Sequence, residues 1–181
     1  MDRSRRQLII LQALGGSAVL ASYAWGFLAN TAAMGALWGG VPEAARPLYT
    51  VNMFLAAGGF FLFAPYITFR VPREALESSE GHTRRWFPSC FALILIPSAI
   101  WLPLTALMIE SPSTGLWWLV RLDLALVAAG ALGLVRGLLT LEDPPPGRAL
   151  ALVGLIPFCV QTVVLDALIW PVYFTVTVTG A

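Results

Sequence analysis

The chain has 181 residues, of which 58% are hydrophobic and 12% are charged. Soluble domains carry about 25% charged residues, so the composition excludes an ordinary soluble domain and indicates a polytopic membrane protein. The net charge of +1 gives no general attraction to nucleic acid, which is therefore not an expected partner.

Five apolar runs are long enough to cross a hydrocarbon core of about 30 Å, which takes about 20 helical residues. They predict an all-α fold: a polytopic bundle of five transmembrane helices that forms a single transmembrane domain over residues 1–181. The connections between the runs carry helix-breaking residues, including three successive prolines at 144–146. We expect the spans at about residues 8–30, 47–69, 87–109, 116–139 and 149–174.

The placement of arginine predicts how the chain is oriented. If the chain crosses five times, the other side of the membrane receives only Arg46, and Arg121 lies within the fourth span. Cytoplasmic loops are the ones enriched in positive charge, so we expect a cytoplasmic N-terminus and an exoplasmic C-terminus in a plasma or inner membrane. The remaining nine arginines then share one side: Arg3, Arg5, Arg6, Arg70, Arg73, Arg84, Arg85, Arg136 and Arg148.

The segment "SRRQLII" near the start also resembles a twin-arginine export signal. We interpret it as the positively charged flank of an uncleaved first span. Cleavage after this segment would instead leave four spans and a new exoplasmic N-terminus.

Polar side chains inside the predicted spans are the candidates for a functional site, because they are costly in hydrocarbon. Given a helical rise of about 1.5 Å per residue, polar groups from four different spans fall in the exoplasmic half, whereas the cytoplasmic half is almost wholly apolar. We therefore predict a polar pocket in the exoplasmic half. Its candidate ligand-binding residues are Asn52, Trp101, Arg121, Asp123, Gln161, Thr162, Asp166 and Trp170.

In the fifth span, Thr162, Asp166 and Trp170 recur at intervals of four residues, and Tyr173 follows three residues later. In an α-helix this spacing puts all four side chains on one face. We expect that face to line the pocket.

In the fourth span, Arg121 and Asp123 are two residues apart and therefore about 200° apart around an α-helix. They are expected to contact different neighbours. Arg121 is the natural counter-ion for Asp166 or Glu110, and the short side chains of Asp123 and Asp166 are more firmly held in the interior than the long one of Arg121.

Small residues at intervals of four favour close helix packing, and we expect this packing within the bundle more than between copies. Prolines inside the third and fifth spans predict kinks beside the pocket. The small residues are Ala129, Gly133 and Gly137, Ser22 and Gly26, and the pair Gly58 and Gly59; the prolines are Pro97, Pro103, Pro157 and Pro171.

Several kinds of chemistry are disfavoured by what the sequence lacks. The only histidine is His82, and the two cysteines, Cys90 and Cys159, form no CxxC pair. No metal, cofactor or serine–histidine triad is expected. Proton transfer by two carboxyl groups, Asp123 and Asp166, is the one enzymatic route that remains.

Three hypotheses follow for the function. The leading one is a protein that binds or transports a small amphipathic or lipid-like ligand, because apolar walls with a few polar anchors suit such a molecule. The alternative is a structural or assembly subunit of a larger membrane complex or homo-oligomer. The third is an intramembrane isomerase. Membrane lipids are expected partners in each case.

Overall fold

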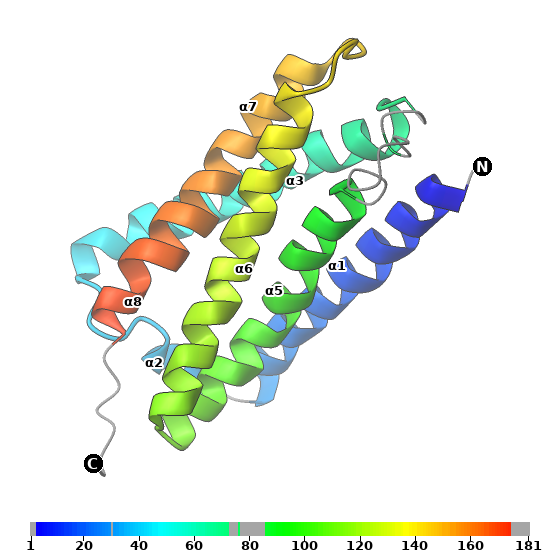
Figure 1. The fold of residues 1–181 in the computed structure, drawn as a ribbon. Coiled ribbons are helices and arrows are strands. Elements are labelled where there is room, and N and C mark those ends of the chain that lie inside the picture. Colours follow the sequence, from blue (N-terminus) through cyan, green and yellow to red (C-terminus); the bar gives the residue numbers. More distant parts are fainter. Residues whose placement is uncertain (1–2, 30, 73–75, 77–85, 175–181) are drawn as a thin grey trace.

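The computed structural model describes residues 3–29, 31–72, 76 and 86–174. All regular secondary structure in these residues is helical (Figure 1). The long elements are α1 (Arg3–Ala29), α3 (Arg46–Phe69), α5 (Trp86–Glu110), α6 (Thr114–Leu139) and α7 (Arg148–Cys159). The last of these continues through a π-helix, η2 (Val160–Ile169), into α8 (Trp170–Tyr173). Two short helices precede α3: α2 (Thr31–Ala36) and η1 (Glu43–Ala45).

The predicted fold class is confirmed, because five of these helices are long and apolar enough to cross a membrane. They are the helices of a multi-pass integral membrane protein. The observed bounds lie within a few residues of the predicted ones, except that α1 begins at Arg3 rather than near Leu8. The helix therefore includes the arginines at its start, which precede its apolar part.

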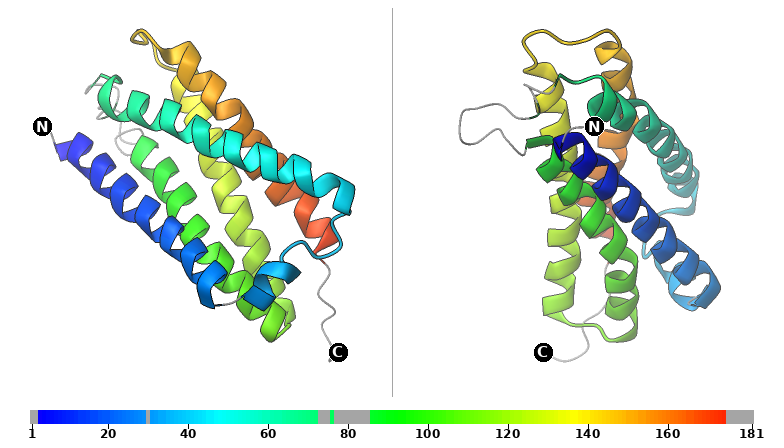
Figure 2. Two further views of the ribbon diagram at one scale, coloured as in Figure 1. Left: turned by 180° about the vertical axis from the view of Figure 1, so that it is seen from behind. Right: turned by 90° about the vertical axis from the view of Figure 1, so that its right-hand side faces the viewer.

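Successive long helices run antiparallel, so the bundle has two ends that serve as landmarks (Figures 1 and 2). We call the end at which α1 begins the N-terminal end; α7 begins and α6 ends there too. The opposite end, where α8 lies, is the C-terminal end. Among the five spans α6 is the most buried and α1 the least.

The helices form an open arrangement rather than a closed ring. α1 packs against α5, α5 against α6, and α3 against α7. α1 and α3 meet near the N-terminal end, where Gln12 Nε2 donates to Thr68 Oγ1 over 2.9 Å. From there they diverge towards the C-terminal end (Figure 2).

Glycines make the closest helix contacts. A Cβ placed on Gly130 would stand 2.7 Å from the Cys90 carbonyl oxygen, and one on Gly133 would stand 2.6 Å from the Cys90 sulfur. Gly137 likewise lies against Phe87. The α5–α6 interface thus depends on side chains no larger than hydrogen along one face of α6.

The second close contact joins α3 to α7. Gly59 lies directly against the backbone of Gly154, so the two helices touch main chain to main chain. The adjacent Gly58 has nothing within 4 Å of where its Cβ would stand. The prediction that small residues pack within the bundle is confirmed for Gly59, Gly133 and Gly137.

Two apolar clusters fill the interior. The larger lies towards the N-terminal end and contains an aromatic group in which Phe63 contacts Phe91 and Phe158 at ring-centroid distances of 6.4 and 5.1 Å. The smaller one, near the C-terminal end, includes Met108 and Trp170. The in-span polar side chains described next lie beside this second cluster.

Candidate functional site: a polar layer near the C-terminal end

A chain of hydrogen bonds links α3 to the fifth span. Asn52, which is 8% exposed, donates from Nδ2 to Gln161 Oε1 and to the Pro157 carbonyl oxygen, both over 3.1 Å. Gln161 Nε2 in turn donates to Asp166 Oδ1 over 2.8 Å. Three predicted site residues are therefore brought together. The Pro157 carbonyl oxygen lies one turn before Gln161, and its bond from Asn52 is a second link between α3 and the fifth span.

The π-helix is the reason that Gln161 and Asp166 meet. Residues five apart are about 140° apart around an α-helix, and their side chains then face different neighbours. Within η2 the backbone bonds shift to five-residue spacing, as where the Trp170 N–H donates to the Leu165 carbonyl. The wider turn brings the amide and the carboxyl group onto one side of the helix.

The prediction that Thr162, Asp166, Trp170 and Tyr173 line one pocket face stays a prediction. It assumed α-helical periodicity through a segment that is π-helical. The Thr162 hydroxyl donates to the Phe158 carbonyl within its own helix, and Trp170 Nε1 donates to the Leu37 carbonyl, both over 2.9 Å. Tyr173 is 38% exposed. Of the four, only Asp166 joins the hydrogen-bond chain.

The register of the α5–α6 interface puts Asp123 and Trp101 at a similar level of the two helices. The Ile94 side chain lies against Gly130; two helical turns from this contact, seven residues along each antiparallel helix, are Trp101 and Asp123. Asp123 is 8% exposed. Its Oδ2 and the indole Nε1 of Trp101 are both buried without a hydrogen-bond partner among the described residues.

Thr105, one turn after Trp101 on α5, adds a third such atom. Its side chain is fully buried, and its Oγ1 has no partner within the described part of the chain. Most buried polar groups are hydrogen-bonded, because leaving one unpaired costs about 1–3 kcal/mol. A donor, an acceptor and a hydroxyl that can act as either therefore remain available beside the second apolar cluster.

Aromatic rings connect this region from α1 to α8. Tyr23 on α1 lies 6.5 Å from the Trp101 ring, and Trp101 lies 5.9 Å from Trp170. Trp170 stacks on Phe174 at 4.2 Å. The row crosses the bundle and places the unpartnered Trp101 nitrogen among flat apolar surfaces.

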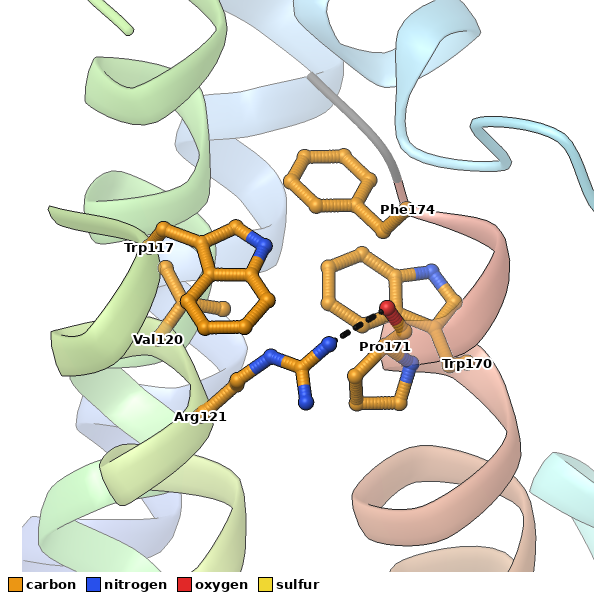
Figure 3. A pocket seen from close by; sticks show the side chains of 6 residues that line it. All are labelled: Trp117, Val120, Arg121, Trp170, Pro171 and Phe174. Atoms are coloured by element: carbon orange, nitrogen blue, oxygen red, sulfur yellow. Dashed lines mark hydrogen bonds between the residues drawn. The ribbon is translucent and has the colours of Figure 1, made fainter. Parts of the chain in front are cut away.

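Arg121 contacts two groups that were not among its expected partners. Its guanidinium lies 3.7 Å from the centre of the Trp117 ring, and its Nη2 donates to the Pro171 carbonyl over 2.9 Å (Figure 3). Asp166 instead accepts from Gln161. Arg121 therefore ties α6 to α8 through a cation–π contact and a backbone carbonyl.

The space beside Arg121 is small. These side chains, with those of Val120, Trp170 and Phe174, line a pocket of about 10 Å³ (Figure 3), which is the room that one water molecule needs. Arg121 and Trp170 both line this space, and their binding of a ligand stays a prediction.

Sequence reasoning did not single out three residues of the layer: Tyr23, Tyr49 and Thr105. Tyr49 Oη donates to the Leu165 carbonyl over 3.4 Å, alongside the Asn52 bonds. A hydroxyl within an apolar span is the signal that could have found all three. Among the residues that the structure describes, no three His, Cys, Asp or Glu side chains are grouped to hold a metal ion.

No family model, curated protein or solved structure matches the chain. The geometry of its own residues is therefore the basis for assigning a function.

Proposed function

We propose that the protein binds a small amphipathic molecule whose polar head lies in the α5–α6 interface beside Asp123 and Trp101. The observation that carries the proposal is a pair of unpartnered atoms, a carboxyl oxygen and an indole N–H, which the register of α5 and α6 puts at a similar level. Both atoms are buried in a span, where no bulk water can satisfy them.

The chemistry of the two atoms favours an alcohol. A hydroxyl group donates one hydrogen bond and accepts others, so one hydroxyl can donate to Asp123 Oδ2 and accept from Trp101 Nε1. The aromatic row supplies the apolar walls that the rest of the ligand would contact. The Asn52–Gln161–Asp166 chain holds α3 to the fifth span behind this site.

The ligand would reach the layer from the side on which α1 and α3 diverge. Two hydrogen bonds join α1 to the α3 region, from Gln12 to Thr68 and from Arg5 to the Val71 carbonyl, and both lie at the N-terminal end. Binding is the proposed activity, and transport would require release on the other side as well.

A long-chain alcohol bearing a photoactivatable diazirine tests the proposal. We expect it to label the purified protein near Trp101, and Trp101→Phe to weaken binding about three- to tenfold, since this change removes one hydrogen-bond donor and little else. Trp118→Phe is the matched control, because Trp118 is 62% exposed. Equal loss in both variants, or labelling that Trp101→Phe leaves unchanged, would contradict the proposal.

A structural or assembly subunit is the second candidate. It is favoured by the hydrogen bonds among Asn52, Gln161 and Asp166, which pair these groups without any ligand. This role predicts that the chain purifies with a partner, in a complex that Asn52→Ala weakens, and that the alcohol probe does not label the α5–α6 interface.

We also propose that the N-terminal end of the bundle is cytoplasmic, on the strength of the arginine distribution. Glu142 lies in the loop at that end, and Ser111 lies in the turn at the other; both are exposed. In a variant with both native cysteines replaced, a membrane-impermeant maleimide should label Ser111→Cys in intact cells but not Glu142→Cys. The reverse pattern would invert the orientation.

A further inference from the structure

A separate apolar groove runs along the outside of α6 and the fifth span, away from the polar layer. Its volume is about 590 Å³, within the range of about 300–1,000 Å³ typical of small-molecule sites. All of its lining side chains are apolar or cysteine. On α6 they are Leu132, Val135 and Leu139; on α7 and η2 they run from Leu152 to Val164 and include Ile156 and Cys159.

The groove has the length of one membrane leaflet. From Leu152 to Val164 the helix rises by at most about 18 Å, and half of a hydrocarbon core is about 15 Å. It begins at the N-terminal end of the bundle and stops near the middle of the span. A single acyl chain of a lipid in that leaflet matches both its length and its apolar lining.

Two arginines flank the N-terminal part of the groove along its two helices, and neither is a lining residue. Arg136 lies between Leu132 and Leu139 on the same face of α6, and Arg148 is one turn before Leu152 on α7. Arg136 is exposed, and neither arginine is in an ion pair with a described residue. Two guanidinium groups near one end of an apolar groove complement a phosphate joined to an acyl chain.

Trp86 indicates the depth of the Arg136 charge in the membrane. Its Nε1 donates to the Gly133 carbonyl over 2.9 Å, and the Arg136 guanidinium lies 5.5 Å from the centre of its ring. Tryptophan at a helix end lies at the depth of lipid head groups. Glu142 and Asp143 follow in the connecting loop, and both are exposed, so their carboxylates have free access to water.

We propose that this groove is a binding site for an anionic phospholipid, with one acyl chain along α6 and α7 and the phosphate between Arg136 and Arg148. The site is independent of the alcohol site proposed above, since it lies on the outer face and shares none of its residues. It would hold one lipid at a fixed place on the bundle.

Native mass spectrometry of the purified protein, titrated with phosphatidylglycerol or phosphatidylcholine of identical acyl chains, tests the proposal. We expect one phosphatidylglycerol to bind more tightly than phosphatidylcholine. Arg136→Gln and Arg148→Gln should each weaken that binding about fivefold, the contribution of one basic residue near an anionic surface. Ile156→Trp, which fills the groove, should weaken both lipids.

Arg70→Gln is the matched control, because Arg70 is exposed at the same end of the bundle, at the end of α3 and outside the groove lining. Equal affinity for the two lipids, or an equal loss in the Arg70 variant, would overturn the proposal in favour of unspecific association. If Ile156→Trp instead separates a dimer into monomers, the groove belongs to a second copy of the chain and the lipid assignment is wrong.

Discussion

The Gln161 amide nitrogen donates to Asp166 Oδ1 over 2.8 Å, although the two residues are five apart on one helix. The π-helical turns of η2 make this possible, and the other end of the same amide accepts from Asn52 on α3. The pair therefore couples a local change of helix type to the contact between two spans.

The first prediction concerns the coupling between Asn52 and Gln161. Unfolding of Asn52→Ala, Gln161→Ala and the double variant in mixed micelles, followed by circular dichroism, should reveal an interaction free energy of about 0.6 and at most about 1.7 kcal/mol, the range for hydrogen bonds between membrane helices. Gln161→Ala should be the more harmful single change, because it also leaves Asp166 without its donor. Strictly additive effects would mean that the bond contributes nothing to stability.

How much of this could be predicted from the sequence depends on the property. Hydropathy predicts the five spans because length and composition alone decide whether a helix fits the hydrocarbon core. Hydropathy carries no information on which backbone carbonyl accepts the hydrogen bond from each N–H group. The π-helix at 160–169 was therefore not predicted, and the contact between Gln161 and Asp166 was missed for that reason.

The partner of Arg121 escaped prediction for a different reason. Sequence reasoning paired it with a carboxylate because opposite charges attract most strongly in hydrocarbon. The fold places the Trp117 ring one turn before it and the Pro171 carbonyl opposite. Backbone carbonyls and ring faces are not visible as charges in a sequence, yet both bind a guanidinium.

The second prediction uses two neighbouring glycines. Gly59→Ala should destabilise the protein by about 1–3 kcal/mol, because its Cβ would meet the backbone of Gly154, which cannot move aside without separating α3 from α7. Gly58→Ala should be neutral or stabilising by up to about 1 kcal/mol, since it adds helix propensity in open space. Equal midpoints of thermal unfolding for the two variants would show that the helices do not approach as described.

The third prediction concerns the link between α6 and α8. Arg121→Leu removes both the Trp117 contact and the bond to the Pro171 carbonyl. Hydrogen exchange measured by mass spectrometry should then become faster for the amides of Trp170 and residues 172–174 and stay unchanged in α3 near Gly59. Exchange that rises equally in both regions would indicate global destabilisation instead of release of α8.

The last prediction compares the two aspartates within the spans, Asp123 and Asp166. Asp166→Leu should destabilise the protein by about 1–3 kcal/mol, because it leaves the Gln161 amide without its acceptor. Asp123→Leu should be neutral or stabilising, because it removes a carboxyl oxygen that is already without a partner among the described residues.

A stabilising loss of Asp123 would have a functional meaning, since groups kept at a cost to stability are typical of binding sites. We expect Asp123→Leu to abolish labelling by the diazirine alcohol while it raises or preserves the midpoint of thermal unfolding. Asp166→Leu should lower the midpoint. If Asp123→Leu lowers the midpoint as much as Asp166→Leu does, the Asp123 carboxyl group has a structural role. That result would contradict the proposal that the ligand binds in the α5–α6 interface.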